Sequence, residues 1–141
     1  MTIRSATPYL ILDGRAERAL TLYAQALGAR VENLQRFGDA DDSCPQAQRD
    51  RVMHAALRVG EALLMLSDGD QAAPPGGRGA VSIALDFADE AELRARFAAL
   101  VETGKAIVAP FDAPWGAVFG VAVDELGVQW MLSCTRAPAG A

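Results

Sequence analysis

Histidine and cysteine are scarce in this chain. One histidine, His54, and two cysteines, Cys44 and Cys134, occur in 141 residues. Two cysteines, one in a polar loop and one near the tail, make neither a disulfide framework nor a zinc site, so both are predicted to be free thiols. With a single histidine, any imidazole ligand or catalytic imidazole must be His54.

Basic clusters and long apolar runs are also lacking. The 13 Lys and Arg residues are outnumbered by 18 Asp and Glu residues, which gives a formal net charge of −5 and argues against general nucleic-acid binding. No apolar run is long enough to cross a bilayer, and the first residues lack a basic-then-apolar signal pattern. We therefore expect a soluble, cytoplasmic protein with no nucleic-acid or membrane partner.

What the chain does have is an internal repeat. The order strand, helix, three strands occurs in residues 1–69 and again in residues 80–135, with a turn-rich linker at 70–79 and a flexible tail at 136–141. This order predicts an α+β fold of paired βαβββ modules, each with a curved sheet and a helix on its outer face, around a cup. The alternative is a single ferredoxin-like α+β sandwich.

The ends of both helices are marked in the sequence. The first helix is expected in residues 15–28, with Gly28 as its C-terminal stop. Asp89 followed by Glu92 forms a capping-box arrangement for the second helix, which Gly104 ends.

Alternation along the strand around His54 indicates where its side chain points. If residues 60–61 form a two-residue hairpin turn, Val59 pairs with Ala62 and His54 pairs with Ser67. One face is then entirely apolar and belongs under the helix. The other face holds His54, Ala56, Arg58, Leu63, Met65 and Ser67, a mixed set with two basic groups among small and flexible apolar ones, which we interpret as a ligand pocket.

The second closing hairpin is interpreted in the same way. An apolar set is expected on one face, namely Phe119, Val121, Val123, Val128, Trp130 and Leu132. The pocket-facing set is then Gly120, Ala122, Gln129, Met131 and Ser133. The two small residues would leave room for a ligand, and the Gln129 amide offers both a donor and an acceptor. Alternatively, this surface packs on a partner chain.

Several side chains are candidates for chemistry. His54 is a candidate general base because imidazole changes its protonation near neutral pH. Arg58 would share its face and hold an anion, and Ser67 would hydrogen-bond to His54. Trp115 either stacks on a ligand ring or anchors an interface, and Tyr9 adds a hydroxyl.

The segments "TPYLILDGRAERALTLYAQALGA", "VMHAALRVGEALLMLSD", "FADEAELRARFAAL" and "PFDAPWGAVFGVAVDELGVQWML" carry a family resemblance. They resemble the vicinal-oxygen-chelate superfamily, which includes the glyoxalase and bleomycin-resistance proteins, and more narrowly its PhnB-like branch. The resemblance implies paired βαβββ modules. It also implies one divalent metal, held by His or Glu from the first and last strands of each module.

This chain departs from the family at those metal positions. It has Pro8 or Tyr9, Met65, Ser82 and Met131 there, none of which is a normal ligand for a divalent ion that prefers imidazole or carboxylate. There is also no strand, glycine-rich loop and helix signature for a nucleotide-like cofactor. We therefore predict neither a metal nor a cofactor.

Three functional hypotheses follow. The first is a small-molecule binding protein that sequesters or senses an apolar or aromatic compound. Its predicted ligand-binding residues are Tyr9, His54, Arg58, Met65, Ser67, Ser82, Trp115, Gln129 and Met131. The alternatives are a lyase, isomerase or oxygenase that uses His54 with Arg58 or an atypical metal, and a structural or partner-binding role. A homodimer is expected, because open sheet edges need covering and members of the resembled family pair their modules.

Overall fold

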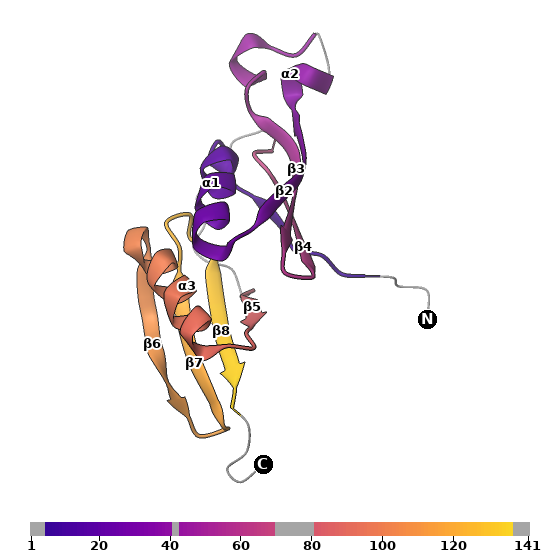
Figure 1. Cartoon of the computed structure of the whole chain (residues 1–141). Helices are drawn as coiled ribbons and strands as arrows, with labels where there is room; N and C mark the ends of the chain where they lie inside the picture. Colours follow the sequence, from indigo (N-terminus) through magenta and orange to yellow (C-terminus); the bar gives the residue numbers. More distant parts are fainter. Residues whose placement is uncertain (1–4, 41–42, 70–80, 137–141) are drawn as a thin grey trace. The chain divides into compact units, whose positions relative to one another are not determined.

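The computed structural model describes residues 5–40, 43–69 and 81–136. The chain divides into two compact units, Met1–Pro75 and Gly76–Ala141. Each unit has a four-stranded mixed sheet and one long helix, so the predicted α+β fold with two βαβββ modules is confirmed (Figure 1). The linker predicted at 70–79 lies outside the described residues, as does the predicted tail beyond Arg136. Within the described ranges, no helix is long and apolar enough to span a membrane.

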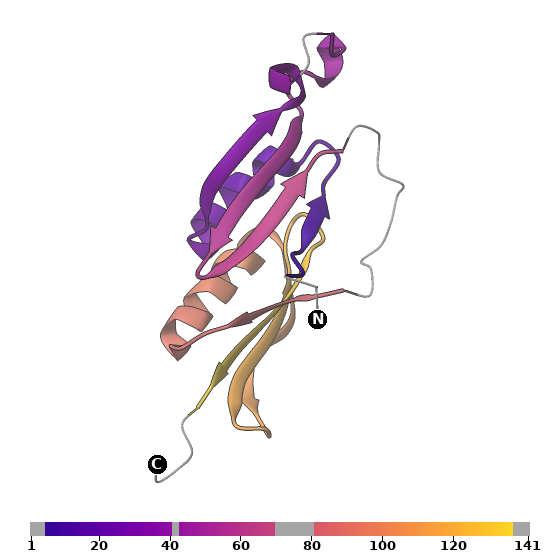
Figure 2. The same cartoon turned by 90° about the vertical axis from the view of Figure 1, so that its right-hand side faces the viewer.

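The first unit is built on a sheet with the strand order β1-β4-β3-β2. Its elements are β1 (Tyr9–Ile11), α1 (Ala16–Leu27), β2 (Arg30–Arg36), α2 (Phe37–Ala40), the 3-10 helix η1 (Gln46–Gln48), β3 (Val52–Val59) and β4 (Ala62–Ser67). Strand β1 runs parallel to β4, and the other pairs are antiparallel. Helix α1 lies against one face of this sheet, and the other face is turned toward the viewer in Figure 2.

The core of the first unit lies between α1 and the sheet. Tyr23 of α1 and Leu57 and Leu66 of the sheet are fully buried there. Gly28 ends the helix in the left-handed conformation at φ 69°, and its N–H donates to the Tyr23 carbonyl, as its position in the sequence predicted. Val59 pairs with Ala62, which confirms the predicted hairpin register.

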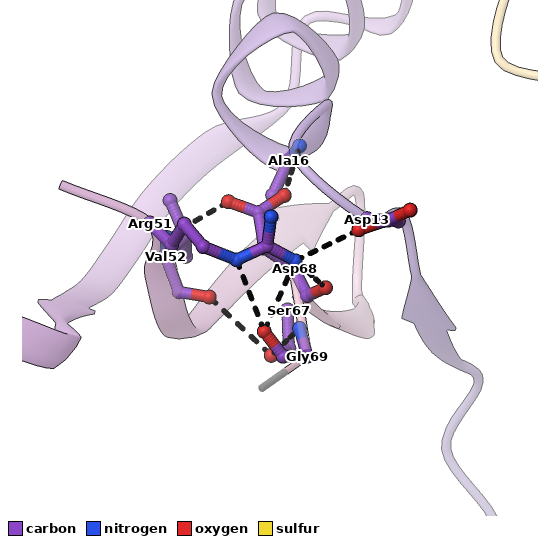
Figure 3. Close-up of polar contacts among 7 residues, drawn as sticks. All are labelled: Asp13, Ala16, Arg51, Val52, Ser67, Asp68 and Gly69. Carbon is purple, nitrogen blue, oxygen red and sulfur yellow. Dashed lines mark hydrogen bonds and ion pairs between the residues drawn. The ribbon is translucent and has the colours of Figure 1, made fainter. Parts of the chain in front are cut away.

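A buried carboxylate joins three elements of this unit (Figure 3). Asp68, just past β4, accepts a hydrogen bond from the Ala16 N–H at the start of α1 and another from the Val52 N–H at the start of β3, both at 2.8 Å. Arg51 donates to the Asp68 carbonyl at 2.7 Å and to the Asp13 carboxylate at 2.9 Å. Asp68 is only 3% exposed, so it acts as a structural bridge.

The second unit repeats this arrangement with the strand order β5-β8-β7-β6. Its elements are β5 (Ile83–Asp86), α3 (Glu90–Thr103), β6 (Lys105–Ala113), β7 (Ala117–Val123) and β8 (Gln129–Thr135). The Asp89 side chain accepts a hydrogen bond from the Glu92 N–H at 3.1 Å, which confirms the predicted N-cap. Leu93, Phe97 and Leu100 form the buried side of α3.

The predicted faces of the second hairpin are wrong for β7. Val121 pairs with Met131 and Val123 with Gln129, so these residues share one face. Gly120 and Ala122 instead pair with Leu132 and Trp130 on the face that packs against α3. A Cβ on Gly120 would lie 3.3 Å from the Phe97 ring of α3. The small residues therefore make room for the helix and not for a ligand.

The side chain of Asp124 explains this register. Its carboxylate accepts hydrogen bonds from the Leu126 N–H at 2.9 Å, the Val128 N–H at 3.1 Å and the Trp130 indole N–H at 2.8 Å. These bonds hold residues 124–128 as the connection between β7 and β8, so Val128 is not part of the paired strand. The prediction placed Val121 and Val123 on the face of Trp130 and Leu132, but the connection at residues 125–127 puts Val123 opposite Gln129 and Val121 opposite Met131.

Candidate functional site

The face of the first sheet that lies opposite α1 is called the open face here. Strand pairing arranges its residues in three rows: Arg30, Arg58 and Leu63; Asn33, Ala56, Met65 and Tyr9; and Gln35, His54, Ser67 and Ile11. The β2–β3 register shifts at Glu32, between the first and second rows, and at Met53, just beyond the third. Such bulges redirect side chains and are frequent next to binding sites.

A hydrogen bond between Tyr9 of the edge strand β1 and His54 of β3 crosses the open face. The Tyr9 hydroxyl is 3.0 Å from Nδ1 of His54, and the two rings are 5.8 Å apart between centroids and tilted by 41°. Tyr9 is 46% exposed, so the pair is accessible. In the described part of the chain, His54 has no other hydrogen-bond partner, so Nε2 is not engaged there.

Sequence reasoning found no partner that would orient His54. It placed Tyr9 at the other end of the cup and expected Ser67 to bond to the imidazole. In the structure, the Ser67 hydroxyl donates to the Val52 carbonyl at 3.3 Å and accepts from the Gly69 N–H at 2.9 Å. The parallel pairing of β1 with β4 brings Tyr9 to His54, and that pairing joins segments that are remote in the sequence.

Arg58 lies on the open face but is already paired. Its Nε is 3.0 Å from Oε1 of Glu32, and its Nη2 is 3.2 Å from Oε2, which makes a bidentate ion pair. The hydrogen bond from Arg58 lowers the pKa of Glu32, and the charges of Arg58 and Arg30 lower it further. The same hydrogen bond raises the pKa of Arg58. Glu32 thus neutralises one of the two guanidinium groups in this row.

The second sheet has a corresponding face opposite α3. Gln129 donates from Nε2 to the Ser82 hydroxyl at 2.6 Å, so two predicted ligand-binding residues lie together. Met131 pairs with Ala84 and lies one row further along the sheet. In the first unit, the partner of Met65 across the parallel strand pair is Tyr9 instead.

Trp115 belongs to an exposed aromatic cluster on the second unit. Its ring centroid is 5.4 Å from that of Phe119 and 6.5 Å from that of Phe111, and the rings meet edge to face. Trp115 is 61% exposed and Phe111 is 41% exposed. The cluster joins the tip of the β6–β7 hairpin to the face of the sheet.

The comparisons with known proteins agree with this architecture. A model of the Glyoxalase/Bleomycin resistance protein/Dioxygenase superfamily matches residues 6–132. The chain belongs to this superfamily. Protein YjdN of Escherichia coli strain K12 is 28% identical over 92% of this chain and 95% of its own length.

Solved structures of this superfamily's fold include close matches. Protein PA1353 from Pseudomonas aeruginosa is 36% identical, covers 96% of this chain and 100% of its own, and superposes with a TM-score of 0.83. A Bacillus cereus PhnB protein, described as a putative 3-demethylubiquinone-9 3-methyltransferase, is 22% identical over 94% of this chain and 100% of its own, with a TM-score of 0.79. At that identity, the second likeness shows the fold alone.

The divalent metal that the superfamily resemblance implies does not fit the residues present. Tyr9 and Met65 are adjacent on β1 and β4, and they offer a phenol and a thioether. Ser82 and Met131 offer a hydroxyl and a second thioether. Within residues 5–40, 43–69 and 81–136, no group of three His, Cys, Asp or Glu side chains is placed to hold a metal ion. The donor set lacks the imidazoles and carboxylates that such ions prefer.

Proposed function

We propose that this protein binds a small apolar or aromatic molecule on the open face of its first sheet and does so without a divalent metal. The observation that carries the proposal is the hydrogen-bonded pair of Tyr9 and His54, which shares the open face with the apolar side chains of Leu63, Ala56, Met65 and Ile11. Ligand sites typically combine apolar walls with a few polar groups that fix the ligand's orientation.

The middle row of the open face is suited to a flat ligand. Ala56 lies between Asn33 and Met65, and its short side chain extends less far from the sheet than theirs do. Met65 offers a flexible, polarizable thioether, which makes favourable contacts with aromatic rings. Tyr9 borders the same row and offers a ring for edge or stacking contacts. An aromatic molecule over Ala56 would contact all three side chains.

A neutral probe tests this proposal. We expect 2-acetylnaphthalene to bind saturably to protein prepared with a chelator, and to shift the ring resonances of His54 and the methyl resonance of Met65. Met65→Glu places a charge on the open face and should weaken binding at least tenfold. Ala62→Glu is the matched control, because Ala62 lies on the same strand, is exposed and points to the other face. Equal effects of the two substitutions, or no saturable binding, would contradict the proposal.

A second candidate function is supported by the same hydrogen bond. A general base at Nε2 needs the tautomer in which Nδ1–H of His54 donates to the Tyr9 hydroxyl and Nε2 is unprotonated. Such a base would remove a proton from carbon next to a carbonyl group, as lyases and isomerases do. The test is exchange of the acetyl protons of 2-acetylnaphthalene in D₂O. An enzyme should accelerate this exchange, and His54→Gln should abolish the acceleration while binding persists.

A further inference from the structure

The open face has an electrostatic polarity along β3. Arg30 and Arg58 are Cα partners at one end, and Glu32 is the carboxylate that pairs with Arg58. Arg58 is held by Glu32, whereas Arg30 has neither a hydrogen bond nor an ion pair within the described ranges. Arg30 is therefore the guanidinium of this row that no carboxylate in the described part of the chain pairs with, in a chain whose formal net charge is −5. A local positive charge on an acidic protein favours an anionic group.

The other end of the open face presents a hydrogen-bond donor. When the Tyr9 hydroxyl donates to Nδ1 of His54, the neutral imidazole carries its proton on Nε2. That N–H then faces a ligand as a donor. Gln35 is the Cα partner of His54 and adds an amide beside it. A ligand group at this end should accordingly be an acceptor, such as a carbonyl oxygen.

The separation of the two ends sets the ligand's length. Arg58 and His54 are four positions apart on β3, which corresponds to about 13 Å between their Cα atoms at about 3.3 Å per residue. Ala56 and Met65 lie between them and offer only apolar surface. A flat body of two fused rings with substituents at opposite ends is of this order of length.

From the positions of Arg30 and His54 at opposite ends of the open face, we infer that the ligand is an elongated aromatic anion. This inference rests on the proposed function. Its acidic group lies at Arg30, its ring system lies over Ala56 and Met65, and its carbonyl oxygen accepts a hydrogen bond from Nε2 of His54. The acidic group is a carboxylate or another oxyanion, because a guanidinium recognises either.

The imidazole end can be tested without any ligand. His54 is the only histidine, so a long-range ¹⁵N–¹H spectrum shows a single imidazole. We expect the neutral ring to carry its proton on Nε2, and Tyr9→Phe to shift the Nδ1 resonance and mix the two tautomers. A neutral ring protonated on Nδ1 in the unaltered protein would overturn the assigned donor.

Matched probes test the anionic end. We expect 6-acetyl-2-naphthoate to bind about tenfold more tightly than its methyl ester at low ionic strength, and about threefold or more tightly than 2-naphthoate, which lacks the carbonyl acceptor. Added salt should reduce the preference for the acid over the ester. Arg30→Gln should remove that preference. Arg96→Gln on α3 should not, although it changes the net charge equally.

The outcomes separate the inference from the proposed function. Equal affinities for the acid and its methyl ester would overturn the anionic end of the inference while leaving small-molecule binding in place. An equal loss in Arg30→Gln and Arg96→Gln would also overturn it, because the effect would then come from net charge. If neither the acid nor neutral 2-acetylnaphthalene binds, both the inference and the proposed function fail.

Discussion

Asp68→Asn is the substitution whose effect on stability follows most directly from the structure. The Asp68 carboxylate is 3% exposed and accepts one hydrogen bond on each oxygen, from the Ala16 N–H and the Val52 N–H, both at 2.8 Å. Asparagine retains one oxygen acceptor but replaces the other with an NH₂ group. That NH₂ group would face a backbone donor, so one buried N–H would be left without an acceptor (Figure 3).

The expected cost is about 2–3 kcal/mol. A hydrogen bond to a charged group contributes about 1.5–3 kcal/mol, and an unsatisfied buried donor costs about 1–3 kcal/mol in mutational series. Both values measure the same loss, so they are not added. With a urea m-value of about 1–2 kcal/mol/M for a unit of this size, the unfolding midpoint of the first unit should fall by about 1–3 M.

The two units can be followed separately in this experiment. Trp115 and Trp130 both lie in the second unit, so tryptophan fluorescence reports that unit, while the backbone amide resonances of β3 and β4 report the first. Asp124→Asn is the matched control, because Asp124 is also 3% exposed and accepts three hydrogen bonds in the second unit. A change below about 0.5 kcal/mol in the first unit for Asp68→Asn would refute the bridging role of Asp68.

Three further predictions concern packing and charge. Trp115→Ala should cost about 1 kcal/mol or less because the ring is 61% exposed, whereas Trp130→Ala should cost about 3–5 kcal/mol because that ring is fully buried; thermal unfolding of the two variants checks the difference. Gly104→Ala should destabilise the second unit by about 1–3 kcal/mol in urea titrations, because a Cβ there collides with the Val123 carbonyl oxygen. The pKa of Glu32, lowered by Arg58, should rise in Arg58→Met when its carboxyl carbon is titrated by NMR. The small stabilisation from the Glu32–Arg58 pair is present above the ordinary carboxyl pKa and is lost as pH falls through the lowered pKa. An unchanged Glu32 titration in Arg58→Met would contradict the role of Arg58.

Local patterns in the sequence predicted most of the fold. The repeated element order, the stop at Gly28, the cap at Asp89 and the turn after Val59 all depend on short-range rules, and the structure confirms each of them. The expected homodimer and the assignment of ligand-binding residues stay predictions.

What the sequence did not predict depends on longer-range or side-chain geometry. The contact of Tyr9 with His54 requires the parallel pairing of β1 with β4, which no local pattern specifies. The faces of β7 depend on how the Asp124 carboxylate holds the following connection, which alternation of apolar residues does not show. Arg58 was expected to hold an anion, but Glu32 at a bulge in β2 occupies its guanidinium.

The central claim is that the open face of the first sheet binds an organic molecule without a metal. The most direct measurement is an NMR titration of chelator-treated protein with 2-acetylnaphthalene, which follows the single imidazole of His54 and the methyl group of Met65. The account predicts saturable shifts at both groups with a shared dissociation constant. Shifts that arise only after a divalent ion is added, or that occur only away from these two residues, would contradict it.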